Sequence, residues 1–137
     1  MNYPDEIWEL LFRWLKKDRE AGRMLKEKGH MELLWLAPAL FENSTEAFSK
    51  LTAMKQVVLS AFVKAVDGES KALKFLLDIK CPQWAATANA VNKDEKARKW
   101  LLNNNFTRLA ELSDIIRNRI EEDDEGSEFE TFFRPFR

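Results

Sequence analysis

Two stretches that lie 25 residues apart decide the fold: KALKFLLDIK (residues 71–80) and KARKWLLNNN (residues 96–105). In each stretch an alanine, Ala72 or Ala97, is followed four residues later by a leucine. Residues four apart lie on the same face of an α-helix, so each stretch predicts a short helix with one apolar stripe. The agreement between them indicates a structural unit that repeats along the chain.

The same pattern can be followed towards the N-terminus. Four copies align when they are anchored on Ala21, Ala47, Ala72 and Ala97. Six columns, at 0, 4, 12, 15, 18 and 19 residues from each alanine, keep an apolar residue in every copy except at Thr87. The spacing predicts that each copy is a short helix, a turn and a second short helix.

Residue types between the apolar columns predict where the helices begin and end. Gly and Asn favour helix ends, and Asp and Ser favour helix starts. We expect the turns eight residues after each alanine, at Gly29, Lys55, Lys80 and Asn105. We expect the helix starts three residues before each alanine, at Asp18, Ser44, Glu69 and Asp94.

These patterns predict an all-α fold, a right-handed stack of short helical hairpins with about four repeats of roughly 25 residues. Residues 7–15, with Trp8, Leu11 and Leu15 on one stripe, predict a capping helix within residues 1–16. We place the repeat domain at residues 1–120 and a C-terminal tail at residues 121–137. A β-rich fold is not expected, because alternation of apolar and polar residues over strand lengths is absent.

The segment CPQWAATANAVNKDEKARKWLLNNN (residues 81–105) resembles the short-period helical repeats of leucine-rich-variant and HEAT-like proteins. In those repeats a helix that starts at a proline is followed by an acidic cap and an Ala/Val-Arg pair, where Ala97-Arg98 stands here. The resemblance covers roughly residues 14–116, but Arg98 is replaced by Leu73, Phe48 and Gly22 in the other copies. It implies a scaffold or binding surface and carries no catalytic residue.

Composition limits the classes of protein that the chain can belong to. One cysteine among 137 residues excludes an intramolecular disulfide. No apolar stretch approaches the roughly 18–20 residues that span a bilayer, so we expect no membrane association of that kind. The N-terminal residues do not resemble a signal peptide, and we expect a cytoplasmic protein.

Few residues suggest catalysis. His30 is the only histidine and follows a predicted turn, so a surface turn residue is favoured over a general base or a metal ligand. Cys81 precedes Pro82 at another turn, where an inert, partly buried thiol is favoured over a reactive one. We expect no enzyme activity, no cofactor and no metal site.

A basic cluster in the last repeat gives an alternative function. Phosphate groups are bound by such clusters, so the chain could associate with nucleic acid. A solvated surface is the more common role of such residues, and we expect nucleic acid binding to be weak. The candidate phosphate-binding residues are Lys93, Lys96, Arg98, Lys99 and Arg108.

Five tryptophans are a large aromatic content for this length. Trp8 and Trp84 fall on core columns of the repeat. Trp100 and Phe75 share one position beside the leucine of the stripe, and we expect them to pack between repeats. An exposed binding platform is the alternative for these aromatic residues.

The tail carries the main functional signal of the sequence. Residues 121–128, EEDDEGSE, contain no apolar side chain, so we expect them not to order by themselves. Residues 129–137, FETFFRPFR, then gather four phenylalanines.

We expect these tail residues to bind another protein or a second copy of the chain. The alternative is that the tail folds back on its own chain and caps the last repeat. The candidate partner-binding residues are Phe129, Phe132, Phe133, Arg134, Phe136 and Arg137. The function that we expect is a non-enzymatic interaction or adaptor module.

Overall fold

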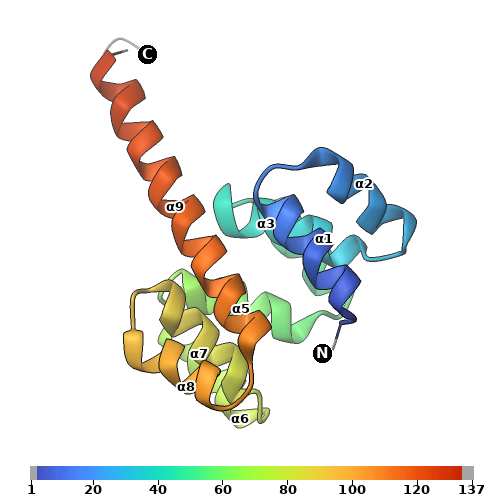
Figure 1. The fold of residues 1–137 in the computed structure, drawn as a ribbon, viewed down its shortest axis with the longest axis vertical. Coiled ribbons are helices and arrows are strands. Elements are labelled where there is room, and N and C mark those ends of the chain that lie inside the picture. Colours follow the sequence, from blue (N-terminus) through green and yellow to red (C-terminus); the bar gives the residue numbers. More distant parts are fainter. Residues whose placement is uncertain (1–2, 134–137) are drawn as a thin grey trace.

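The structure, a computed structural model, describes the backbone of residues 3–133 and the side chains of residues 3–122. Within this part the chain is all-α and contains no strand, which confirms the predicted class (Figure 1). The helices are α1 (Asp5–Leu15), α2 (Arg19–Glu27), α3 (Met31–Phe41), α4 (Thr45–Ala53), α5 (Val57–Val66), α6 (Ser70–Asp78), α7 (Pro82–Val91), α8 (Glu95–Asn103) and α9 (Thr107–Phe133).

All four predicted helix starts are confirmed, because Asp18, Ser44, Glu69 and Asp94 are the N-caps of α2, α4, α6 and α8. Asp18 Oδ1 accepts hydrogen bonds from the backbone N–H groups of Glu20 and Ala21, at 3.1 and 3.3 Å. Ser44 and Asp94 cap their helices in the same way, whereas the longer Glu69 side chain makes no such bond.

The predicted turns are also confirmed. Gly29, Lys55, Lys80 and Asn105 all have positive φ, between 59° and 83°. In each turn the next residue donates its backbone N–H to a leucine carbonyl five positions back, as His30 does to Leu25 at 2.9 Å. This is the Schellman pattern, which satisfies carbonyls at a helix end. Each predicted turn therefore ends one helix and directs the chain into the next.

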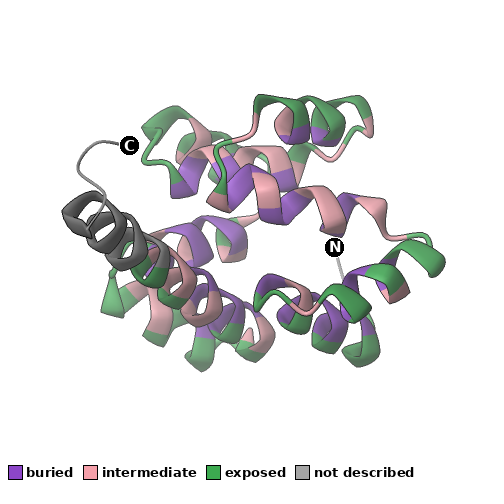
Figure 2. Cartoon of the chain, turned by 90° about the horizontal axis from the view of Figure 1, so that it is seen from above, coloured by how far each residue is buried: buried purple, intermediate pink, exposed green. Residues whose placement is uncertain are grey.

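The helices form two layers. The inner helices, α1, α3, α5, α7 and α9, contact one another in that order, and α9 also contacts α1. The outer helices, α2, α4, α6 and α8, pack mainly on the helices that precede and follow them in the chain. Figure 2 shows the exposed positions along the outer edges of the molecule and the buried ones facing inward. The core therefore lies between the inner helices and beneath the outer ones.

One leucine anchors each outer helix in the core. Leu25, Leu51, Leu76 and Leu101 are all 0% exposed, as the apolar column predicts. Thr87, the polar exception in the repeat, is equally buried, and its hydroxyl donates a hydrogen bond to the carbonyl of Gln83 at 2.6 Å. The hydroxyl is thus satisfied inside its own helix, which allows a polar residue at a core position.

The structure corrects the expectation that Phe75 and Trp100 pack between repeats. Phe75 is 41% exposed and Trp100 is 39% exposed. Both residues lie on outer helices, which other helices cover on one side only. Each stands directly before the buried leucine of its helix and faces solvent. Trp100 stacks on Phe106 with the ring centroids 5.9 Å apart, so it is partly covered from within its own turn.

The last helix is longer than the sequence predicts. The expected boundary at residue 120 falls inside α9, whose backbone is helical through Phe133. Glu is a good helix former, which gives a local reason for a helix in the acidic run. The side chains of the candidate tail residues lie outside the described part of the chain, and so does the backbone of Arg134, Phe136 and Arg137.

Candidate interaction groove

A groove of about 580 Å³ opens on the surface between α1, α2, α3 and α9. Its size falls within the range of about 300–1,000 Å³ that is typical of ligand sites in proteins. The apolar wall is formed mainly by α3, with one residue from α1. These wall residues are Trp14, Met31, Leu34, Trp35, Ala37 and Pro38.

The wall follows from the composition of α3, MELLWLAPALF, which is apolar on almost every side. Leu33 and Leu36 face the core and are at most 1% exposed. Leu34 and Trp35, on another side of the helix, stay half-buried and line the groove. Pro38 has no N–H to donate to the carbonyl of Leu34, so this side of α3 also lacks one helical hydrogen bond.

Trp14 is positioned by a close contact with α2. A Cβ atom at Gly22 would lie 2.6 Å from Cε3 of the Trp14 ring, so only glycine leaves room for the indole there. The Trp14 indole N–H is buried and has no hydrogen-bond acceptor among the described residues. Buried donors are usually paired, so a donor without a partner beside a groove is a feature of interest for binding.

Four cationic side chains surround the apolar wall: Lys17, Arg19, Lys26 and Arg119. Glu42 is the one carboxylate among the lining residues. A second hollow, of about 390 Å³, shares Lys17 and Arg119 with the groove and adds Lys16 and the carboxylate of Glu122. The site therefore combines apolar surface with an excess of positive charge.

Arg119 links the groove to the rest of the fold. Its guanidinium donates a hydrogen bond to the carbonyl of Leu15 at 2.8 Å and lies 4.1 Å from the centroid of the Phe41 ring. Lys50 Nζ of α4 lies 6.0 Å from the centroid of the Trp35 ring. Each of these contacts places positive charge against an aromatic ring.

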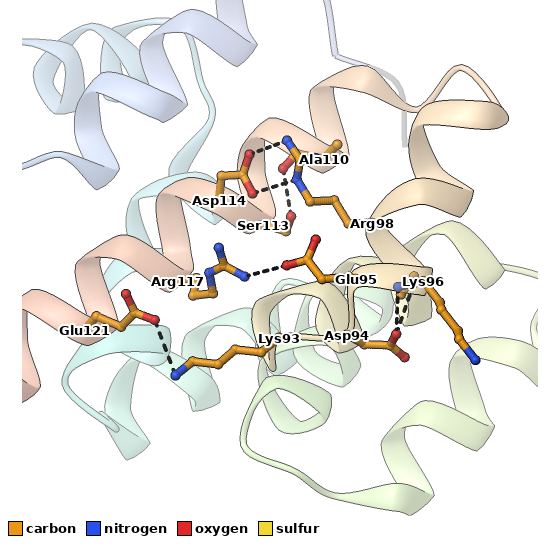
Figure 3. Close-up of polar contacts among 11 residues, drawn as sticks. Lys93, Asp94, Glu95, Lys96, Arg98, Ala110, Ser113, Asp114, Arg117 and Glu121 are labelled. Carbon is orange, nitrogen blue, oxygen red and sulfur yellow. Dashed lines mark hydrogen bonds and ion pairs between the residues drawn. The ribbon is translucent and has the colours of Figure 1, made fainter.

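The structure does not assemble the predicted phosphate-binding cluster as a free basic patch. Arg98 makes two hydrogen bonds of 2.9 Å to Asp114, and the hydrogen bonding with this carboxylate raises the pKa of Arg98 (Figure 3). Lys93 Nζ lies 3.5 Å from Glu121. Both carboxylates come from α9, so this helix pairs with two of the five cations of the predicted cluster.

Arg108 is taken up in a different ion-pair network. Its guanidinium donates a hydrogen bond to Glu9 at 2.7 Å and lies within 3.5 Å of Asp5 and Glu111. Of the predicted cluster, Lys96 and Lys99 remain exposed on α8, and within the described residues no carboxylate pairs with either. Lys71 and Lys74 occupy the corresponding exposed positions of α6.

His30 follows the turn at Gly29, as expected, and its side chain is partly buried there, with 27% of it exposed. Its Nδ1 lies 3.0 Å from Glu32 Oε1, and its ring meets Tyr3 edge-on at 5.5 Å. Burial raises the pKa of the Tyr3 hydroxyl, which donates a hydrogen bond to Glu32. Cys81 is partly buried at the start of α7, as expected. Among the described residues no group of three or more potential metal ligands comes together.

The groove is the site that sequence reasoning missed. Its parts come from α1, α2, α3 and α9, and no repeat column connects them. One signal was available: α3 has apolar residues beyond those that the repeat columns require, which marks a second apolar face.

No helix in the described part of the chain has the length and apolar character needed to cross a membrane. Comparison with protein-family models, with curated proteins and with solved structures finds no match to this chain.

Proposed function

We propose that this chain is a non-enzymatic protein-interaction module whose groove binds an acidic segment that carries aromatic side chains. The observation that carries the proposal is the pairing of an apolar wall, which includes Trp14 and Trp35, with a rim of four cationic side chains. Interfaces between proteins are enriched in tryptophan, methionine and arginine, and all three occur here.

The two parts of the groove support different aspects of binding. A phenylalanine of the partner that becomes buried against the wall contributes about 1.5–3 kcal/mol, which makes aromatic side chains good anchors. The cations at the rim attract acidic residues, which raises the association rate and discriminates against basic segments. A ligand with only aromatic or only acidic side chains would contact only one of the two parts of the groove.

We also propose that the described helices form about four repeats of a right-handed stack, with the groove where its first helices meet α9. Support comes from the equivalent positions of the copies: Leu25, Leu51, Leu76 and Leu101 are equally buried. The turns that follow them have the same backbone conformation. Stacked helical repeats commonly act as binding scaffolds.

A direct test uses a synthetic helical peptide of glutamate and alanine with phenylalanines three and four residues apart, the spacing that one helical face requires. The full chain, with its indole nitrogens labelled for NMR, is titrated with this peptide. We expect the indole N–H signals of Trp14 and Trp35 to shift, and those of the core residues Trp8 and Trp84 to stay in place.

Matched variants locate the binding site. Trp35→Ala should weaken binding, whereas Trp100→Ala, which removes a half-exposed tryptophan from α8, should leave it unchanged. A peptide with lysine in place of glutamate should bind much more weakly. Equal binding of both peptides, or shifts centred on Trp100, would show that the groove does not have the proposed role.

A further inference from the structure

We infer, on the basis of the function proposed above, that the segment bound in the groove is residues 121–137 of a second copy of this chain. Two copies would exchange these segments reciprocally and form a dimer. The inference depends on the chemistry of the segment, on the reach of α9 and on the charge of the groove.

The chemistry of residues 121–137 matches both parts of the groove. The segment carries seven acidic and two basic side chains, and it contains four phenylalanines. The phenylalanines stand at positions 129, 132, 133 and 136. Phe129, Phe132 and Phe133 have the i, i+3, i+4 spacing by which an amphipathic helix anchors in an apolar groove of a partner, whereas Phe136 follows Pro135, which does not fit inside a continuing helix.

The course of α9 favours a second copy over the same chain. Figure 1 shows the C-terminal part of α9 running away from the other helices. Between Arg119, which lines the groove, and Phe133 the helix advances by about 21 Å, at about 1.5 Å per residue. The four residues after Phe133 can span at most about 14 Å. They cannot return to the groove of their own chain while α9 keeps this course.

Charge complementarity supports the same pairing. Among the described residues, the rim of the groove holds Lys17, Arg19, Lys26 and Arg119 and one carboxylate, that of Glu42. Glu122 of α9 lines the hollow beside the groove together with Lys17 and Arg119, and Glu121 pairs with Lys93 of the same chain. The residues that follow, 123–137, carry five acidic and two basic side chains. A segment with the opposite excess of charge is therefore present in every copy. Reciprocal exchange fills both grooves of a pair and closes the assembly as a dimer.

The test measures the oligomeric state of the full chain by sedimentation equilibrium. We expect a dimer, and we expect the double variant Phe132→Asp, Phe133→Asp to be monomeric. The double variant Arg19→Glu, Lys26→Glu changes two exposed residues of the groove and should raise the dissociation constant about tenfold or more. Lys71→Glu with Lys74→Glu makes the same charge change on α6 and should leave the dimer intact.

Mixing the variants tests direct docking. The phenylalanine variant keeps an intact groove and the groove variant keeps an intact tail, so an equimolar mixture should form a heterodimer that neither variant forms alone. A monomeric wild-type chain, a dimer that survives both changes, or a mixture that stays monomeric would each overturn the inference. If the synthetic acidic peptide still shifts Trp14 and Trp35 while the wild-type chain is monomeric, the proposed function stands and the second copy is not the partner.

Discussion

Gly22 shows how one missing side chain shapes the candidate site. It lies inside α2 with ordinary helical backbone, so conformational freedom does not explain the glycine. The reason is steric, because the Trp14 ring occupies the space that a Cβ atom would need, with Cε3 and Cζ3 at 2.6 and 2.8 Å. Alanine favours a helix over glycine by about 1 kcal/mol, so this contact offsets an intrinsic preference.

We predict that Gly22→Ala lowers the free energy of unfolding by about 1–3 kcal/mol, the usual cost of overpacking. The indole N–H signal of Trp14 should shift at the same time, because the ring must move. Urea unfolding and the NMR spectrum of the indoles measure the two effects. The groove should bind the acidic peptide less tightly once its wall is displaced.

A double-mutant cycle separates the steric effect from helix propensity. In a Trp14→Ala background the space beside residue 22 is empty, so the same Gly22→Ala change should stabilise the chain, by about 0.5–1 kcal/mol. A destabilising effect of equal size in both backgrounds would show that the Trp14 ring is not the cause.

At the scale of the elements, the outer helices are short units that depend on a single anchor. Helices α6 and α8 have nine residues each, and each buries one residue fully, Leu76 or Leu101. Isolated helices of this length are marginal in water. Their stability must therefore come from the packed leucine, the Schellman turn at the end and, in α8, the hydrogen-bonded cap formed by Asp94.

We predict that Leu76→Ala and Leu101→Ala each lower the free energy of unfolding by about 2–5 kcal/mol, because each leaves a cavity in the core. The next residue in each helix gives a matched control. Leu77 is 55% exposed and Leu102 is 39% exposed, so their replacement by alanine should cost much less. Chemical denaturation of the four variants measures the difference, and equal losses at both positions would contradict the anchoring role.

The elements were predictable because local sequence determines them. An N-cap, a left-handed turn residue and an apolar stripe act within a few residues, and the predictions for Asp18, Asn105 and Leu76 depend on nothing further away. The exposure of Phe75 and Trp100 was not predictable in this way. Periodicity shows which residues share a helical face, but not how much of the face the neighbouring helices cover.

The groove was beyond local reasoning for a related reason. It joins Trp14 and Trp35 to Arg119, which is about a hundred residues from the first of them. Such a site forms only when α9, the last inner helix, packs against α1, the first. The basic cluster was predicted from its cations alone, and its partners, Asp114 of α9 and Glu9 of α1, come from other elements.

At the scale of the whole molecule, α9 closes the row of inner helices by packing on α1. The side chains of two arginines, Arg108 and Arg119, make contacts across this junction. Arg108 pairs with Glu9, and Arg119 donates a hydrogen bond to the carbonyl of Leu15. The junction brings the chain's last described helix against its first, and it places Arg119 at the groove. The same packing of α9 gives Arg98, Arg108 and Arg119 hydrogen-bond partners within the chain.

This use of the arginines leads to a prediction about nucleic acid. Arg98 and Arg108 are each held by carboxylates, so phosphate binding would have to break existing ion pairs. The exposed cations that remain on this part of the surface include Lys96 and Lys99, beside the half-exposed Trp100.

We expect a mobility-shift assay to show no complex with single-stranded or duplex DNA at physiological salt. At low salt we expect weak binding, because few phosphates can be contacted, and we expect it to be lost as salt is added, because phosphate contacts release counterions. Lys96→Glu with Lys99→Glu should abolish that binding, whereas Lys55→Glu, on a turn far along the chain, should not. A salt-resistant, sequence-selective complex would contradict this prediction and favour nucleic acid over protein as the partner.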